Sequence, residues 1–67
     1  MKVRVLYRGQ VKELHFKGEK VRAQEVLRAL GLSGEYAFVV RGQEILSEKD
    51  YVSEGEEVRV VNAISGG

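Results

Sequence analysis

Alternating polar and apolar residues open the chain. Residues 2–8 alternate and are rich in β-branched side chains, which predicts a β-strand. Residues 11–17 form a second such run, and the intervening Gly9-Gln10 pair suits a two-residue type II′ turn. This turn would place Val5 opposite Leu14. One face of the hairpin then carries Val3, Val5, Tyr7, Leu14 and Phe16, and the other carries Arg4, Leu6, Glu13 and His15.

The pattern then changes from a period of two to a helical period. Over residues 20–31 one apolar stripe recurs at i, i+3, i+4 and i+7, formed by Ala23, Val26, Leu27 and Leu30. Gly31 follows the last of these residues. A glycine there, followed by the apolar Leu32, is typical of a Schellman cap. We therefore predict one helix that ends just before Gly31.

Three further apolar runs predict strands in the second half of the chain. They cover residues 36–41, 44–46 and 57–63, with a polar loop over 47–55. The order β-β-α-β-β-β indicates an α+β fold of the β-grasp (ubiquitin-like) type. One helix would pack across one face of a mixed sheet of four to five strands. The residues predicted to fill the core are Val3, Val5, Leu14, Phe16, Val26, Leu27, Leu30, Phe38, Ile45, Val58 and Val60.

The length and the net charge of the chain limit the classes of protein to which it can belong. A chain of 67 residues makes one small domain, and without cysteine it has no disulfide to stabilise it. The net charge of +1 lacks the basic footprint of a nucleic-acid-binding protein. No apolar run approaches the roughly 18 residues of a membrane span, and no signal peptide precedes the first strand. We expect a cytoplasmic protein that contacts neither nucleic acid nor membrane directly.

Residues able to perform catalysis are scarce. Cysteine is absent and Asp50 is the only aspartate, so no nucleophile–base–acid triad can be assembled. His15 is the only histidine and is interpreted as a surface residue, because one histidine cannot build a metal site. Glu54, Glu56 and Glu57 crowd around a glycine and are interpreted as a solvated turn. We expect no catalytic residue, no metal and no enzymatic activity.

The end of the chain is the strongest chemical candidate. Gly66-Gly67 follows the last predicted strand with no intervening linker, so we divide the chain into a β-grasp domain over 1–63 and a flexible tail over 64–67. A carboxylate is a poor electrophile, whereas its acyl adenylate can be attacked by a sulfur or an amine. Glycine has no Cβ and can enter a narrow enzyme channel. The alternative is a frayed terminus without a role.

Several segments of the chain resemble those of a known protein family. The Arg41-Gly42-Gln43-Glu44-Ile45 turn, the Glu54-Gly55-Glu56-Glu57-Val58 turn and the Ser65-Gly66-Gly67 end are similar to those of the ThiS/MoaD sulfur carriers. Among related proteins, the chain looks closest to the archaeal small modifiers and ubiquitin-related modifiers. It lacks the Pro-Pro pair that many molybdopterin carriers show before the tail.

This resemblance implies a function for the terminal glycines. A ubiquitin-activating-type enzyme would use ATP to adenylate Gly67, which would then become a thiocarboxylate, and the carrier itself would bind no permanent cofactor. The sulfur would pass to a tRNA thiolase, a thiazole synthase or a pterin synthase subunit. Two alternatives remain. One is a modifier conjugated to lysines through Gly67 without a sulfur role, and the other is a β-grasp nucleic-acid-binding module, which the neutral charge disfavours.

A docking surface for the activating enzyme is also predicted. If Phe38 points inward, strand parity turns an apolar patch with an arginine rim toward the uncovered sheet face, which suits a protein interface. In related carriers this face meets the activating enzyme. The alternative is a set of unrelated β-forming residues. The predicted patch comprises Leu6, Val39 and Val61, rimmed by Arg4, Arg41 and Arg59.

Overall fold

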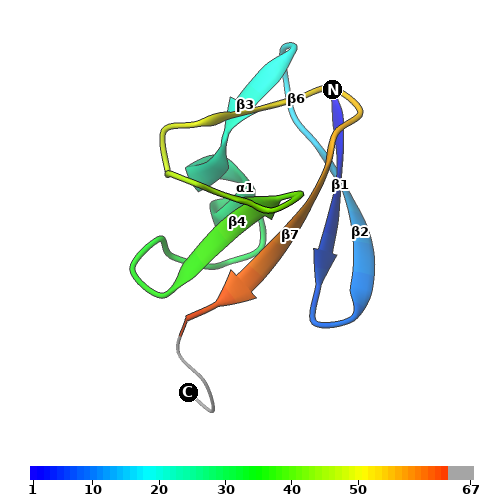
Figure 1. Ribbon diagram of the computed structural model, residues 1–67. Helices are drawn as coiled ribbons and strands as arrows, with labels where there is room; N and C mark the ends of the chain where they lie inside the picture. Colours follow the sequence, from blue (N-terminus) through cyan, green and yellow to red (C-terminus); the bar gives the residue numbers. More distant parts are fainter. Residues whose placement is uncertain (64–67) are drawn as a thin grey trace.

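The described part of the chain folds into two sheets and one helix. The computed structural model describes residues 1–63 (Figure 1). A five-stranded sheet has the order β2-β1-β7-β4-β5, and β3 and β6 form a separate two-stranded sheet. The elements are β1 (Lys2–Tyr7), β2 (Gln10–His15), β3 (Lys20–Arg22), α1 (Ala23–Ala29), β4 (Ala37–Arg41), β5 (Glu44–Leu46), β6 (Tyr51–Ser53) and β7 (Glu57–Asn62).

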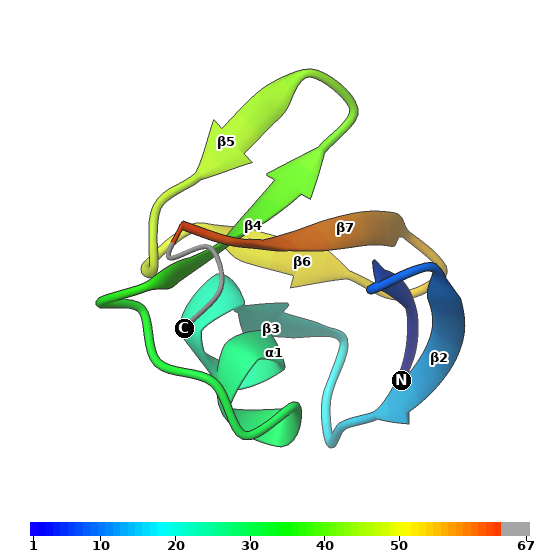
Figure 2. The same ribbon diagram turned by 90° about the horizontal axis from the view of Figure 1, so that it is seen from below.

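The last strand, β7, occupies the middle of the large sheet. It runs parallel to β1 on one side and antiparallel to β4 on the other, so the sheet is mixed. Figure 2 shows α1 on one side of this sheet, next to the β3–β6 pair. The α+β, β-grasp prediction is confirmed, with five strands in the main sheet. The short strands β3 and β6 were not predicted as strands.

The first hairpin has a different turn from the one predicted. Arg8 and Gly9 are its two central residues, with φ of 53° and 76°, as a type I′ turn requires. Tyr7 therefore lies opposite Gln10, and Val3 opposite Leu14. The predicted register was wrong by two residues. Because side chains alternate with a period of two, a shift of two leaves the same residues on each face.

The helix begins later than predicted because residues 20–22 pair with another strand. Val21 lies opposite Val52 of β6 in an antiparallel strand pair. The backbone groups of residues 20–22 pair with β6 in this ladder and are therefore not available for a longer helix. No side chain caps the helix N-terminus. Instead, the Ala23 and Gln24 amides donate to the carbonyls of Asp50 (2.8 Å) and Glu48 (3.1 Å). The loop before β6 therefore satisfies two amide groups that a helix leaves unpaired.

The helix ends as predicted. Gly31 has φ of 77°, and its amide donates to the Arg28 carbonyl over 2.9 Å. The Leu32 amide donates to the Leu27 carbonyl, also over 2.9 Å. These two bonds define a Schellman motif. Leu32 is partly buried against the core, as that motif favours.

The core lies between α1 and the inner face of the sheet. Val3, Val5, Val26, Leu27, Val58 and Val60 are buried as predicted, and Leu14, Phe16 and Leu30 are partly buried against them. The prediction was wrong for Phe38 and Ile45, since Ile45 is 65% exposed. The buried residues absent from the predicted core are Ala23, Ala37, Val39, Val40, Leu46 and Val52.

The error on β4 has a simple physical cause. The segment Ala37–Val40 is apolar at every position, so its pattern does not distinguish the two faces. The sheet register decides the matter. Val39 lies opposite Val60 of β7 and Leu46 of β5, both of which point inward, and Val39 is only 1% exposed. Phe38 and Val40 consequently face the side of the sheet without the helix.

Candidate functional site

The strand β7 leads directly to the terminal segment, and its last residues are held from both sides. The Asn62 Nδ2 donates to the Tyr7 hydroxyl of β1 over 3.2 Å. The Ala63 amide donates to the Tyr36 carbonyl, just before β4. Figure 1 shows β7 running between β1 and β4 to the end of the described chain. The rigid sheet therefore fixes the position from which the tail starts.

The two terminal glycines lie outside the described residues. Gly66 and Gly67 belong to the segment 64–67, which the structure does not describe. Their proposed activation and the division into a 1–63 domain and a 64–67 tail stay predictions. The structure specifies the point on the body where that segment begins.

The sheet face opposite α1 carries a continuous row of side chains. Arg59 lies opposite Leu6 of β1 and Val40 of β4. One row of paired residues crosses all five strands in the order Val11, Leu6, Arg59, Val40 and Ile45. Val61, which is 38% exposed, lies opposite Phe38 one row nearer the end of β7. We call this surface, formed by these seven residues, the open face.

Of the six residues of the predicted docking patch, four lie on the side of the sheet opposite α1 and two do not, and their role in docking stays a prediction. Leu6, Arg59 and Val61 belong to the open face. Val39 does not, because it is buried in the core beneath the helix. Arg41 shares the strand parity of Val39 and also lies on the other side of the sheet. On β4, Phe38 and Val40 occupy the open face instead, although Val40 is only 7% exposed.

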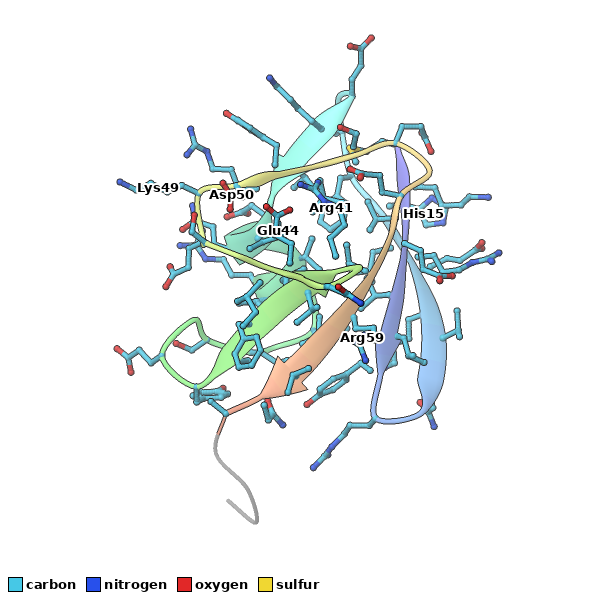
Figure 3. All side chains as sticks on the ribbon, in the orientation of Figure 1. His15, Arg41, Glu44, Lys49, Asp50 and Arg59 are labelled. Carbon is cyan, nitrogen blue, oxygen red and sulfur yellow. The ribbon has the colours of Figure 1, made fainter. Side chains whose placement is uncertain are left out.

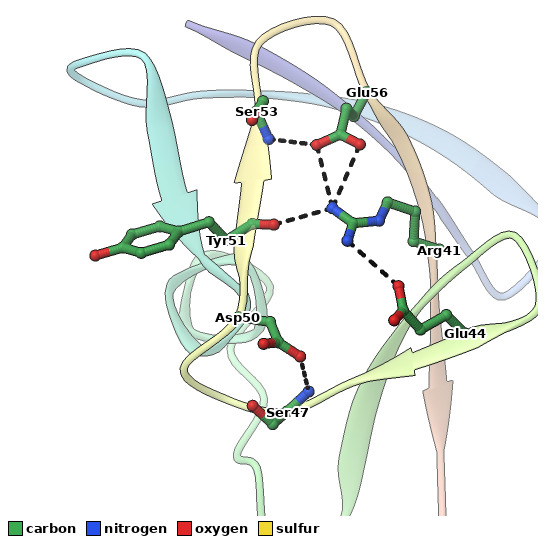
Figure 4. Close-up of polar contacts among 7 residues, drawn as sticks. All are labelled: Arg41, Glu44, Ser47, Asp50, Tyr51, Ser53 and Glu56. Carbon is green, nitrogen blue, oxygen red and sulfur yellow. Dashed lines mark hydrogen bonds and ion pairs between the residues drawn. The ribbon is translucent and has the colours of Figure 1, made fainter.

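Arg41 forms a structural cluster at the far end of β4 (Figure 4). Its Nη1 donates to the Tyr51 carbonyl over 3.0 Å and to Glu56 Oε1 over 3.3 Å. Its Nη2 donates to Glu44 Oε1 over 3.3 Å. Glu56 Oε1 also accepts the Ser53 amide at 2.6 Å. Arg41 thus links β4, β5, β6 and the turn before β7, and Figure 3 shows it beside Glu44 and apart from Arg59.

The acidic turn around Gly55 is a structural feature. The Glu54 carboxylate accepts the Lys2 backbone amide, and Glu57 lies 3.9 Å from the Arg4 guanidinium. Arg4 also approaches Glu13 at 3.7 Å. Each glutamate of the turn therefore has a partner in the protein, so the turn is more than the solvated loop that the sequence indicated. The rim residue Arg4 is on the open side of the sheet, within these ion pairs.

No second chemical centre is found in the described part of the chain. His15 is exposed on β2, opposite Lys2, as expected of a surface residue. Within residues 1–63, no three histidine, cysteine or acidic side chains gather as metal ligands. None of the helices described is long and apolar enough to cross a membrane. The root of the tail and the open face are the features that remain.

The contact between Asn62 and Tyr7 was not predicted, although the sequence contained a signal for it. Val58, Val60 and Asn62 share one parity, so the alternation that turns two valines inward also turns a polar amide inward. A polar side chain on the apolar face of a strand requires a partner. That partner, Tyr7, was assigned to the inner face of the hairpin, but the two residues were not connected.

Comparison with known proteins identifies the family. The model of the ThiS family matches residues 5–67. The chain belongs to the ThiS family. A similar protein is the sulfur carrier protein TtuB of Thermus thermophilus, which is 43% identical over 63 residues. The match covers 94% of this chain and 95% of the relative.

A solved structure with low sequence similarity shares the ThiS-family fold. The crystal structure of ATBAG1 in complex with HSP70 matches with a TM-score of 0.76 and 13% identity. This chain is covered to 92% but spans only 40% of that longer chain. The likeness therefore concerns the fold alone.

Membership of the ThiS family settles the class of protein. Members of the family are small carriers and not enzymes, and the name of the relative agrees with this. The expectation that this chain is not an enzyme is confirmed. The nearer resemblance to archaeal small modifiers is not tested by these matches and stays a prediction.

Proposed function

We propose that this protein is a sulfur carrier whose Gly67 carboxylate is adenylated and then converted to a thiocarboxylate. The observation that carries the proposal is the ThiS-family match, which extends to Gly67 and includes Gly66. The relative that aligns over 94% of this chain is named a sulfur carrier protein. A carrier of this kind needs no catalytic side chain of its own.

The chemistry requires an external enzyme and ATP. A carboxylate oxygen of Gly67 attacks the α-phosphorus of ATP, pyrophosphate leaves, and an acyl adenylate forms. A sulfide ion then attacks the acyl carbon and AMP leaves, which gives the thiocarboxylate. If the sulfur arrives instead as a persulfide, an acyl disulfide forms first, and a thiol must reduce it, releasing the thiocarboxylate while the thiol is oxidised to a disulfide. The ubiquitin-activating-type enzyme holds the ATP. The carrier therefore needs no permanently bound cofactor.

The length of the tail suits this reaction. From Asn62, five further residues reach at most about 17 Å when fully extended. The folded body can therefore remain outside the activating enzyme while Gly67 enters its nucleotide site. Glycine at the last two positions permits the close backbone approach that a narrow channel demands.

The open face is the proposed docking surface for the activating enzyme. It presents apolar side chains around Arg59, and no acidic partner of Arg59 is found among residues 1–63. Val61 is exposed and is the open-face residue nearest the end of β7. Arginine at the centre of an apolar surface is typical of protein interfaces, where a few anchor residues supply most of the binding energy.

The acceptor of the sulfur is a second partner. We propose a tRNA thiolase, a thiazole synthase or a pterin synthase subunit, without direct contact between the carrier and nucleic acid or membrane. The proposal includes a cytoplasmic location, where ATP is available. The alternative of a lysine-conjugated modifier without a sulfur role receives less support, because the name of the relative specifies a sulfur carrier.

The deciding experiment is the intact mass of the protein recovered from its native cells. A thiocarboxylate raises the mass by the difference between one sulfur and one oxygen atom. Oxidation adds a similar mass, so alkylation must also modify the terminal peptide. A terminus that remains a plain carboxylate in cells, together with no ATP–pyrophosphate exchange in the presence of the cognate activating enzyme, would contradict the proposal.

A further inference from the structure

A polar side chain interrupts the apolar inner face at the end of β7. Val58 and Val60, which precede Asn62 with the same parity, are 1% and 5% exposed. The Asn62 Nδ2 donates to the Tyr7 hydroxyl over 3.2 Å. The Asn62 Oδ1 is buried and has no hydrogen-bond partner among residues 1–63. Reversing the amide exchanges the two atoms and still leaves one of them unpaired.

Stability alone does not explain this asparagine. One hydrogen bond contributes a small net free energy, and the desolvation of an unpaired buried polar atom costs as much or more. An apolar residue of similar size would continue the valine pattern of β7 without that cost. Since unpaired buried groups in native proteins are rare, a polar residue at this position calls for an explanation other than core packing.

We propose that Asn62 and Tyr7 form a root clamp, which sets the direction in which the tail leaves the sheet. The inference rests on the proposed function, because the root clamp would aim Gly67 at the nucleotide site of the activating enzyme. The Asn62–Tyr7 bond holds β7 to β1 beyond their last paired residues, Tyr7 and Val60. On the other side, the Ala63 amide bonds the Tyr36 carbonyl.

The geometry explains why a small restraint at the root matters at the tip. When the tail is held extended in a narrow enzyme channel, a tilt of about 10° at its root would displace an end about 17 Å away by about 3 Å. A misplacement of about 1 Å can reduce a reaction rate by about a hundredfold. Asn62 and Tyr7 are thus positioning residues, which act on the reacting carboxylate through the intervening backbone.

The test measures ATP–pyrophosphate exchange by the cognate activating enzyme as a function of carrier concentration. The variants are Asn62→Leu and Tyr7→Phe, each of which removes one side of the bond. We expect kcat to fall about tenfold in both, with KM changed less than about twofold, because the open face still docks. The double variant should lose no more than either single one, since both break the same interaction.

The chain offers a matched control in Tyr36→Phe. Tyr7 and Tyr36 are both partly buried against the core, but no hydrogen bond of the Tyr36 hydroxyl is found in the described chain. Tyr36→Phe should therefore retain the wild-type kcat. Urea unfolding completes the test: Asn62→Leu should match or exceed the wild-type midpoint, so the lost rate does not follow from lost folding.

Three outcomes would overturn the root clamp. One is a wild-type kcat in Asn62→Leu. Another is an equal loss of rate in Tyr36→Phe. The third is a loss of rate that merely follows the unfolded fraction of each variant. Absence of exchange with the wild-type carrier is different, because it would overturn the proposed function and the clamp together.

Discussion

On the face of the main sheet that α1 covers, β7 places Val58 and Val60, and both are buried. On the open face, the intervening residues of the same strand are Arg59 and Val61, and both are exposed. The backbone, the hydrogen-bond ladder and the strand propensity are shared by the two faces. What differs is whether another layer of the protein removes the side chains from water.

This difference separates stability from recognition. Apolar residues under the helix contribute to the free energy of folding, roughly in proportion to the area they remove from water. The exposed apolar residues of the open face, Val11, Ile45 and Val61, contribute less to folding and remain available to a partner. Substitutions on the covered face should therefore change the unfolding midpoint, and those on the open face or beyond β7 should change activation.

The largest expected effect lies beyond both faces, at the terminus. Deleting Gly67, or replacing Gly66 with Val, should abolish adenylation and leave the urea midpoint unchanged. The first change removes the reacting carboxylate from its position, and the second adds a β-branched side chain where close approach is needed. ATP–pyrophosphate exchange measures the effect. Normal exchange by the shortened protein would show that the tail is not the reacting group.

The next effect concerns the covered face. Leu27→Ala should lower the free energy of unfolding by about 2–5 kcal/mol, because it leaves a cavity beneath the helix. In a small domain this is a large share of the total stability. The matched control is Ile45→Ala on the open face, which should change stability by no more than about 0.5 kcal/mol. Urea denaturation measures both midpoints. Equal shifts would show that the covered and open faces contribute equally to stability.

A charge on the open face should affect binding and spare the fold. Val61→Asp should weaken binding to the activating enzyme by at least about tenfold, or about 1.4 kcal/mol. The control Gln43→Asp adds the same charge in the β4–β5 turn, away from the end of β7, and should bind normally. Titration calorimetry decides between them. Equal affinities for Val61→Asp and the wild type would mean that the enzyme holds only the tail.

The smallest expected effect concerns Arg41, which lies on the covered side of the sheet. Because this side chain bonds Tyr51, Glu56 and Glu44 and is absent from the open face, Arg41→Gln should leave enzyme binding unchanged. It should cost about 1 kcal/mol of stability or less, as partly exposed ion pairs do. Added salt should reduce that cost. A tenfold loss of affinity in Arg41→Gln would return this residue to the docking surface.

Several elements could be predicted because local signals agreed. The alternation in β1 and β7, the apolar stripe of α1 and the Gly31-Leu32 cap each stem from the chemistry of neighbouring residues. The hairpin turn was misplaced, yet both faces were assigned correctly, since an error of two residues preserves the alternation. The candidate site was predicted in part, with Leu6, Arg59 and Val61 on the correct face.

The sequence by itself determined the element types, the inner residues of the alternating strands and the family-like glycine end. Only the tertiary structure decided the facing of Phe38, Val39 and Val40, because a strand that is apolar throughout takes its parity from its neighbours. The same holds for β3, whose three residues become a strand by pairing with β6. Asn62 and Tyr7 are 55 residues apart, so only the parallel pairing of β1 with β7 brings them together.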